Sequence, residues 1–308
     1  MYIDDLRQLE QAMRTPEMLN MTIDYLAENL KKFLHPGDKF MICFDNHEPD
    51  NIGDLLARAA EKIGVTVFLP DDLRWKTILK LAFSSRACAI SAPPFVVLGL
   101  TKLARHTQTP LYFRNVITVG YRCSNWIIEG IQKGLDCQVW GCLGPGSGAL
   151  VSGFTCNKEA VIHLRDDLFD FEIEDSAGNI LADGESGYVI ITPKDMPQLR
   201  YHTVECAKMR RTPCACGCTS ALLTDMYSGA DVDEYEERLG RELMLWTSVL
   251  DCRFRRGRHG LEIELVMIPG EKLPPLPECG GRVIRNWNPE KDMPYWFRPT
   301  WRKTQENS

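Results

Sequence analysis

Residues Lys39–Pro70 read KFMICFDNHEPDNIGDLLARAAEKIGVTVFLP and divide into an apolar run, a helical stretch and a second apolar run. The runs Lys39–Phe44 and Val65–Pro70 are short and rich in β-forming residues, which is typical of buried strands. Residues 51–64, between them, carry apolar residues at helical spacing. A strand, a helix and a second strand in this order form a right-handed crossover between parallel neighbours. The stretch therefore predicts an α/β fold.

The same alternation continues through the first half of the chain. Two helices are predicted before the first strand, over residues 3–13 and 16–33. Beyond the second strand, helices and strands alternate over residues 73–82, 87–92, 94–103, 116–119, 124–133 and 136–141. We therefore predict a mostly parallel sheet with flanking helices, in an α/β subdomain that spans residues 1–148.

The second half of the chain has a different pattern. Short β-rich runs separated by turn signals predict a β-rich subdomain over residues 149–228, a meander or distorted barrel packed beside the parallel sheet. A helix over residues 232–245 and a hairpin turning within residues 255–260 predict a small C-terminal α+β domain and tail, residues 229–308. The proline-rich stretch 272–281 and the tail are expected to be irregular.

Composition narrows the classes of protein that the chain can be. Its 308 residues are 44% hydrophobic and 25% charged, which is typical of a globular protein. The net charge of −6 argues against a nucleic-acid partner. The longest apolar run, Ala87–Leu100, is too short to span a membrane and contains two prolines. The acidic, amphipathic start resembles no targeting signal. We therefore expect a cytoplasmic protein whose twelve cysteines stay reduced.

Four residues have the chemistry of a metal site. The stretch RTPCACGCTS, residues 211–220, offers Cys214 and Cys216 on a turn that Gly217 helps to bend. The stretch CNKEAVIH offers Cys156 and His163. Thiolates with an imidazole are what structural zinc prefers, although on spacing alone buried free thiols remain the alternative. Iron also stays open, and Cys218 is an additional candidate ligand.

Residues 163–220, which read HLRDDLFDFEIEDSAGNILADGESGYVIITPKDMPQLRYHTVECAKMRRTPCACGCTS, contain several motifs in a fixed order. An acidic-aromatic strand is followed by a hairpin at Gly184–Gly187, by LRYHTVE at Leu199–Glu205 and by CACG at Cys214–Gly217. This order resembles the phenylacetate–coenzyme A ligase branch of the adenylate-forming (AMP-binding, acyl-CoA synthetase) enzymes. The resemblance implies a structural zinc ion. Its implied ligands are Cys156, His163, Cys214 and Cys216.

The resemblance also implies an activity and its cofactors. Such enzymes use ATP and Mg²⁺ to convert a carboxylate into an acyl-adenylate, and then transfer the acyl group to a thiol such as CoA. The small-molecule partners would therefore be a carboxylate, ATP or AMP, and CoA. Candidate nucleotide-binding residues match three family motifs: an aromatic-glycine pair, a glycine turn and an arginine-to-acid motif. They are Trp140 and Gly141; Gly120, Tyr121 and Arg122; and Arg200 and Glu205.

Several family motifs are missing from the sequence. The residues before Pro36 contain no Ser/Thr/Gly-rich phosphate loop, so the resemblance describes an N-terminally shortened member. The Mg²⁺-binding glutamate expected after Trp140–Gly141 is absent, and no C-terminal segment supplies the family's lysine. No catalytic residue is therefore assigned. The alternative hypothesis is a catalytically degenerate member, a nucleotide- or acyl-binding scaffold or partner subunit. A partner protein would then supply the phosphate loop.

Overall fold

The structure is a computed structural model of the whole chain. It describes residues 6–44, 49–120, 125–144, 151–156, 158–159, 161–228, 234–257, 260–275, 281–286, 288 and 291–294. The helices are α1 Leu6–Ala12, α2 Pro16–Leu30, α3 Ile52–Lys62, α4 Trp75–Ser85, α5 Pro94–His106, α6 Asn125–Leu135 and α7 Glu234–Leu245. None of the helices in these ranges is long and apolar enough to cross a membrane.

The strands form two sheets. The first half of the chain gives β1 Lys39–Ile42, β2 Thr66–Phe68, β3 Ala89–Ser91, β4 Asn115–Val119 and β5 Gln138–Leu143. The middle gives β6 Gly153–Thr155, β7 Ile162–Leu164, β8 Phe169–Glu174, β9 Ser186–Pro193, β10 Tyr201–Arg210 and β11 Leu222–Ser228. The C-terminal part gives β12 Val249–Gly257, β13 Gly260–Met267 and β14 Gly281–Asn286.

The first eleven strands belong to one continuous sheet, in the order β2-β1-β3-β4-β5-β6-β7-β11-β10-β9-β8. Strands β2 to β5 pair in parallel, and every pairing from β5 to β8 is antiparallel. The predicted α/β architecture with flanking helices is confirmed. The expectation that the β-rich part packs beside the parallel sheet is wrong, because β6 continues that sheet through hydrogen bonds to β5.

The parallel half is a three-layer sandwich. Alternate residues of each strand point to opposite faces, so Phe40 and Ile42 pack with α2 and α3 while Met41 packs with α4, α5 and α6. The helices start as their sequences predict. For example, the Thr15 side chain accepts a hydrogen bond from the Met18 N–H at the start of α2, where Pro16 occupies the first helical position.

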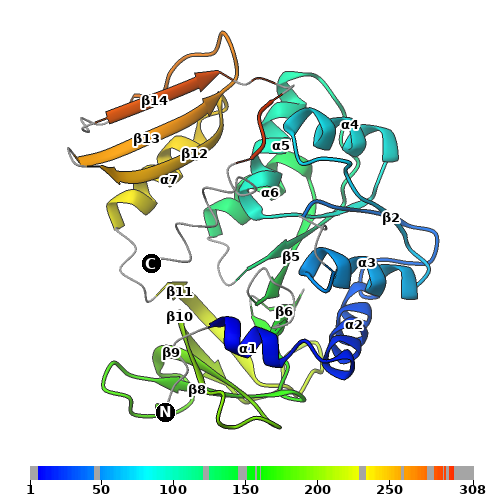
Figure 1. Cartoon of the computed structure of the whole chain (residues 1–308), viewed down its shortest axis with the longest axis vertical. Coiled ribbons are helices and arrows are strands. Elements are labelled where there is room, and N and C mark those ends of the chain that lie inside the picture. The colour runs from blue at the N-terminus through cyan, green and yellow to red at the C-terminus, as the bar shows by residue number, and fades with distance from the viewer. Residues whose placement is uncertain are drawn as a thin grey trace.

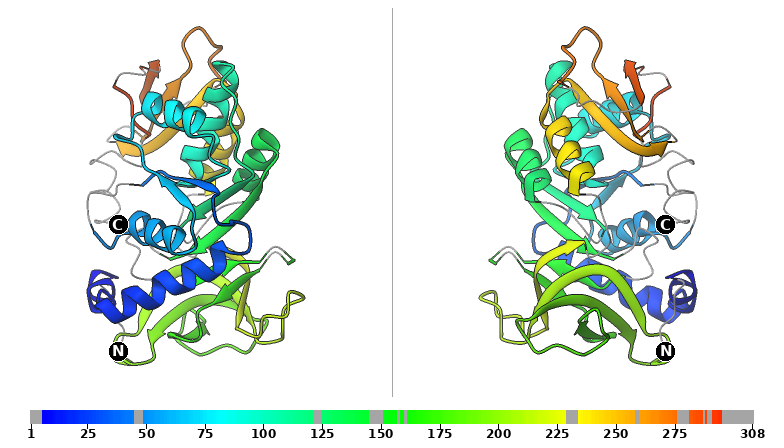
Figure 2. Two further views of the ribbon diagram at one scale, coloured as in Figure 1. Left: turned by 90° about the vertical axis from the view of Figure 1, so that its right-hand side faces the viewer. Right: turned by 90° about the vertical axis from the view of Figure 1, so that its left-hand side faces the viewer.

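The C-terminal part packs on the same core. Buried residues of α7, β12 and β13 share one hydrophobic cluster with α4 and α5, and they include Leu243, Leu250 and Leu265. Figures 1 and 2 place this small sheet at the opposite end of the molecule from β8 to β10, with the parallel half between them. The predicted hairpin is present as β12 and β13. The expectation of an irregular tail is wrong for β14, which pairs in parallel with β13.

Candidate metal centre and candidate nucleotide site

Strand pairing brings the two halves of the predicted metal site together. Strands β6 and β7 form a hairpin, and Cys156 at its turn donates its N–H to the Val161 carbonyl at 3.0 Å. His163 lies on β7 opposite Leu222. Leu222 is the first residue of β11 and follows the cysteine turn. In that turn Gly217 adopts a left-handed φ of 88° and donates its N–H to the Cys214 carbonyl.

The four predicted ligand atoms form a compact group. The three Sγ atoms and the imidazole nitrogen all lie within 4.8 Å of one another, and Cys218 does not belong to the group. The Cys156 and Cys214 sulfurs are 3.7 Å apart, and the Cys216 sulfur lies 3.4 Å from His163 Nε2. Around a tetrahedral zinc ion the corresponding separations would be about 3.8 Å and about 3.5 Å. The residues therefore fit a tetrahedral thiolate–imidazole site.

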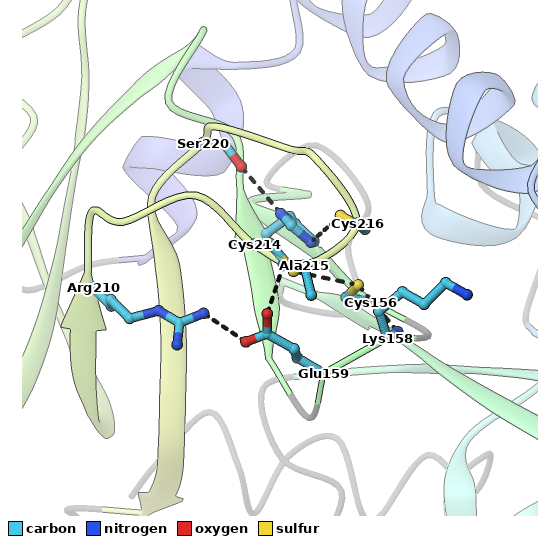
Figure 3. A network of polar contacts seen from close by, with 9 residues as sticks. Cys156, Lys158, Glu159, Arg210, Cys214, Ala215, Cys216 and Ser220 are labelled. Carbon is cyan, nitrogen blue, oxygen red and sulfur yellow. Dashed lines mark hydrogen bonds and ion pairs between the residues drawn. The ribbon is translucent and has the colours of Figure 1, made fainter.

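Outer residues orient these ligands (Figure 3). Ser220 Oγ lies 3.4 Å from His163 Nδ1, which leaves Nε2 facing the cysteines. Glu159 accepts a hydrogen bond from the Ala215 N–H at 2.6 Å and forms an ion pair with Arg210 at 2.6 Å. The Ala215 amide lies between the two ligand cysteines, so Glu159 fixes the position of the turn.

The pKa shifts of two candidate ligands, His163 and Cys156, favour metal binding. Burial lowers the pKa of His163, with a further contribution from Lys32, so its imidazole is neutral and able to bind a metal. Burial alone would raise the pKa of Cys156. Backbone N–H groups of Lys158 and Glu159, together with the neighbouring thiols, outweigh it and hold that pKa below its usual value. The pKa of Cys214 is instead raised to about 12 despite the Cys216 N–H, because burial and the neighbouring Cys216, Cys156 and Glu159 favour its neutral thiol.

Trp140 lies in the core, with the ring of Phe33 against its own. It is 2% exposed, and its ring stacks on Phe33 at 4.5 Å between centroids. Its indole N–H donates to Asn115 Oδ1 at 3.1 Å. In this conformation Trp140 is part of the core between α2 and the sheet, and its role in nucleotide binding stays a prediction.

The other nucleotide candidates occupy three separate places. Gly120 follows β4 with a φ of 136°, a left-handed conformation, and its N–H donates to the Cys142 carbonyl. Gly141 lies on β5, where a Cβ atom would come within 2.9 Å of the Thr155 side chain, so close packing also accounts for this glycine. Tyr121 and Arg122 lie outside the described residues.

Arg200 and Glu205 lie in the antiparallel half, and three strands separate β10 from β5 in the sheet order. Arg200 pairs with Glu172 at 2.7 Å and also with Glu174. Glu205 is 5% exposed and lies on β10, where the register with β9 shifts between His202 and Cys206. Of the predicted site residues, the metal ligands are brought together, whereas Trp140, Arg200 and Glu205 have separate surroundings.

Several solved structures that the chain resembles in fold are CoA ligases. 2-Hydroxyisobutyryl-CoA ligase in the postadenylation state, in complex with 2-HIB-AMP, matches with a TM-score of 0.67 at 11% identity, over 94% of this chain and 72% of that chain. A benzoate CoA ligase from Burkholderia xenovorans LB400 matches with a TM-score of 0.54 at 12% identity, over 86% of this chain and 61% of that chain. The chain has the fold of the CoA ligases.

The CoA ligase fold confirms the sequence resemblance at the level of architecture. No protein-family model and no curated protein matches the chain. The open conformation of 2-hydroxyisobutyryl-CoA ligase, in complex with 2-HIB-AMP and CoA, matches with a TM-score of 0.61 at 13% identity over 81% of this chain. This chain spans 59% of the length of that structure, which is less than two thirds.

Residues around the metal group were not predicted from the sequence. Glu159, Ser220 and Arg210 hold the ligands, and only Glu159 had a local signal, an acid three residues after a candidate ligand cysteine. Ser220 contacts His163, and Arg210 contacts Glu159, across long sequence separations. Those contacts depend on the pairing of β7 with β11, so no local pattern could have revealed them.

Proposed function

We propose that the protein is an adenylate-forming, carboxylate–CoA ligase-like protein. It would activate a carboxylate with ATP to give an acyl-adenylate, and then transfer the acyl group to a thiol such as CoA. The observation that carries this proposal is the match of 94% of the chain to a CoA ligase whose structure holds 2-HIB-AMP. Mg²⁺ bound with ATP would offset negative charge on the phosphates during attack by the carboxylate.

Within this proposal, Gly120 begins the loop that faces the nucleotide, together with Tyr121 and Arg122. Support comes from the position of Gly120 at the carboxyl end of β4, because open α/β sheets bind ligands at that edge. Glu205 is the acid proposed for the ribose hydroxyls, since a buried carboxylate can accept hydrogen bonds from two of them. Gly141 and Arg200 complete the proposed nucleotide site.

A second candidate function is a non-catalytic scaffold or partner subunit that binds a nucleotide or an acyl ligand. It is favoured by the surroundings of two predicted nucleotide residues. Phe33 covers the Trp140 ring, and Glu172 and Glu174 neutralise the Arg200 guanidinium. A partner protein carrying a Ser/Thr/Gly-rich phosphate loop would then complete the site.

Calorimetry with ATP, with and without Mg²⁺, tests the proposal, and pyrophosphate exchange over a panel of carboxylic acids follows it. The ligase function predicts micromolar ATP binding that Glu205→Gln weakens, and exchange that depends on one class of acid. Lys208→Gln on the same strand is the matched control and should bind ATP as the wild type does. ATP binding without exchange favours the scaffold, and no binding by the isolated chain contradicts both unless a partner restores it.

We also propose that Cys156, His163, Cys214 and Cys216 hold a structural zinc ion. Four protein ligands would fill the coordination sphere of the ion and leave no open position for a substrate. The bound ion would link the β6–β7 hairpin to the turn before β11. Replacing Cys214 and Cys216 by serine should release about one zinc ion per chain and lower the unfolding midpoint, because metal binding contributes to folding. Metal analysis and thermal denaturation measure both effects. Cys218→Ser is the control that should retain the metal, and iron instead of zinc would contradict the assignment.

A further inference from the structure

A cavity of about 420 Å³ lies on the antiparallel half of the large sheet. It is lined by residues of β8, β9, β10 and β11 and by the turn that follows β8, and we call it the β8–β11 cavity. None of the described metal ligands or candidate nucleotide residues lines it. Its volume lies within the range of small-ligand pockets, about 300–1,000 Å³.

Strand register brings two tyrosines to this cavity, one on each side of a small residue. Cys206 of β10 pairs with Tyr188 of β9 on one side and with Tyr227 of β11 on the other. Directly opposed residues point to the same face of a sheet, and all three line the cavity. Tyr227 leans across β10 toward β9, because its hydroxyl lies 3.3 Å from Ser186 Oγ. Both rings therefore border the same space beside Cys206.

A ligand in this space can reach the rings. Tyr227 is 47% exposed, so a large part of its aromatic surface is open to solvent. Tyr188 is half-buried, and His202 packs against its ring at 4.8 Å between centroids. Cys206 is small and buried, and its side chain leaves the space between the two tyrosines unfilled. The accessible wall of the cavity is therefore aromatic.

The cavity also carries an excess of negative charge. Glu174 and Asp175 line it, and none of the described lining residues is basic. Arg200 pairs with Glu174 but also with Glu172, so one guanidinium faces two carboxylates. Hydrogen bonds from Asn179 hold the pKa of Asp175 below its usual value, so this carboxylate is charged at neutral pH. A cation is therefore the kind of ligand that the cavity attracts.

The two carboxylates already accept hydrogen bonds from the protein. Asp175 accepts from the Ala177 and Asn179 backbone N–H groups, both at 2.9 Å, and from the Asn179 side chain. Glu174 is buried and accepts from Arg200. A primary amine would have to compete with these donors for the carboxylate oxygens. A quaternary ammonium ion donates no hydrogen bond, and both negative charge and aromatic faces attract it.

We propose that the β8–β11 cavity binds a small quaternary ammonium ion. The cation would lie against the rings of Tyr188 and Tyr227, because a cation within about 6 Å of a ring centroid is attracted by the ring face. Asp175 and the buried Glu174 would contribute their charge without direct hydrogen bonds. Binding requires neither ATP nor a metal ion, so the result is independent of the proposed ligase function.

The test is a calorimetric titration of the full chain with choline chloride and with 3,3-dimethylbutan-1-ol, a neutral compound of the same shape. The wild type should bind choline at least about tenfold more tightly, because only choline carries the charge that the rings and carboxylates attract. Tyr227→Leu should weaken choline binding about fivefold, whereas Tyr227→Phe keeps the aromatic face and should bind as the wild type does. Tyr112→Leu removes another exposed tyrosine and should leave the affinity unchanged. Thermal denaturation checks that each variant is folded.

Three results would overturn the proposal. The first is that the wild type binds no choline, or binds the neutral compound equally well, and this comparison does not depend on how any variant folds. The second is unchanged choline affinity in folded Tyr227→Leu. The third is potassium chloride competing with choline at equal concentration, which would make the cavity a simple cation site.

Discussion

Glu159 has an unusual place beside the four candidate metal ligands, because it is not one of them and yet holds the cysteine turn. The Ala215 N–H and the Arg210 guanidinium lower its pKa to about 2, so it is ionised at neutral pH. Its charge also opposes the effect of Lys32 on His163. Glu159 therefore holds the turn that carries Cys214 and Cys216, while its charge acts against the lowered pKa of His163.

Glu159→Gln keeps an acceptor for the Ala215 N–H and removes the charge that pairs with Arg210. We expect the affinity for zinc to fall about tenfold, the size of effect known for outer-shell partners of metal ligands. Competition with a chromophoric chelator measures this loss. Glu61→Gln, on the exposed face of α3, is the charge-matched control, and an equal loss in that variant would show that the effect is not specific to the turn.

The buried Lys102 side chain should make the free energy of unfolding depend on pH. Burial lowers its pKa to about 8, with partial compensation from Cys252 and Asp251 of β12, whereas a lysine in the unfolded chain has a pKa of about 10.4. Between these values the unfolded chain binds more protons than the folded one, so the free energy of unfolding should rise with pH. Below pH 8 the group is charged in both states and contributes no slope.

Urea denaturation of the wild type and of Lys102→Met at pH 7.5 and 9.5 tests this. The wild type should gain stability relative to the variant at the higher pH. Lys80→Met, which removes an exposed lysine, should show no such change. If the difference in free energy of unfolding between the wild type and Lys102→Met is the same at both pH values, Lys102 keeps an ordinary pKa.

At the level of single residues, the structure brings the four predicted metal ligands together and places Trp140 in the core. Type and spacing alone left free thiols as an alternative for these four residues, and it was the order of the family motifs that pointed to them as one set. Trp140 lies in a motif that is equally compatible with a buried strand residue. The burial of its ring depends on Phe33, which lies far upstream in the sequence and packs on the ring only after folding.

Among the elements, the β6–β7 hairpin determines whether the metal ligands meet. Gly153 begins β6, and a Cβ atom there would lie 2.8 Å from the His163 carbonyl oxygen and 2.7 Å from the Ile162 side chain. Strand β7 must approach β6 this closely, because it also pairs with β11 on its other side. A side chain at position 153 would push His163 away from the cysteines.

Gly153→Ala should therefore lower the free energy of unfolding by about 2 kcal/mol, typical of overpacking, and should reduce the zinc content. Chemical denaturation and metal analysis measure the two effects. Gly178→Ala is a useful comparison, because its φ of 84° costs about 1 kcal/mol for a non-glycine residue while no atom lies within 4 Å of its Cβ position. That variant should keep its metal.

The sequence also predicted most elements of the parallel half, and missed what depends on distant pairing. Helix α4 begins and ends within three residues of its predicted range, and α3 and β4 agree still better. Strand β14 was missed because its sequence, GRVIRN, is short and follows a proline-rich stretch. Its partner β13 became visible only in the folded chain, where the two strands pair in parallel.

For the molecule as a whole, a close contact at Gly99 is one of several that join the C-terminal part to the parallel half. Gly99 of α5 lies so close to β12 and α4 that a Cβ atom would be 2.6 Å from the Leu250 carbonyl oxygen and 2.5 Å from the Trp75 ring. Both neighbours are fully buried. The shared core of α4, α5, α7 and β12 depends on this glycine.

Gly99→Ala should weaken the attachment of the C-terminal part, with a loss of about 3 kcal/mol at the upper end of overpacking effects. Limited proteolysis should then release the C-terminal part faster than in the wild type. Gly240→Ala in α7, where the nearest atom is the Phe254 ring at 3.3 Å, should be nearly neutral. Equal protease resistance of Gly99→Ala and the wild type would contradict the role of this contact.

The continuity of the large sheet has a mechanical consequence. Strands β6 and β7 have three residues each, and the β5–β6 and β7–β11 pairings join only two residue pairs, against six for β8 and β9. Under tension applied between α3 and β8, the sheet would separate first at the β5–β6 or the β7–β11 pairing. The four-ligand group bridges the β7–β11 pairing and leaves the β5–β6 pairing without such a link, so metal occupancy would strengthen the first against tension and not the second.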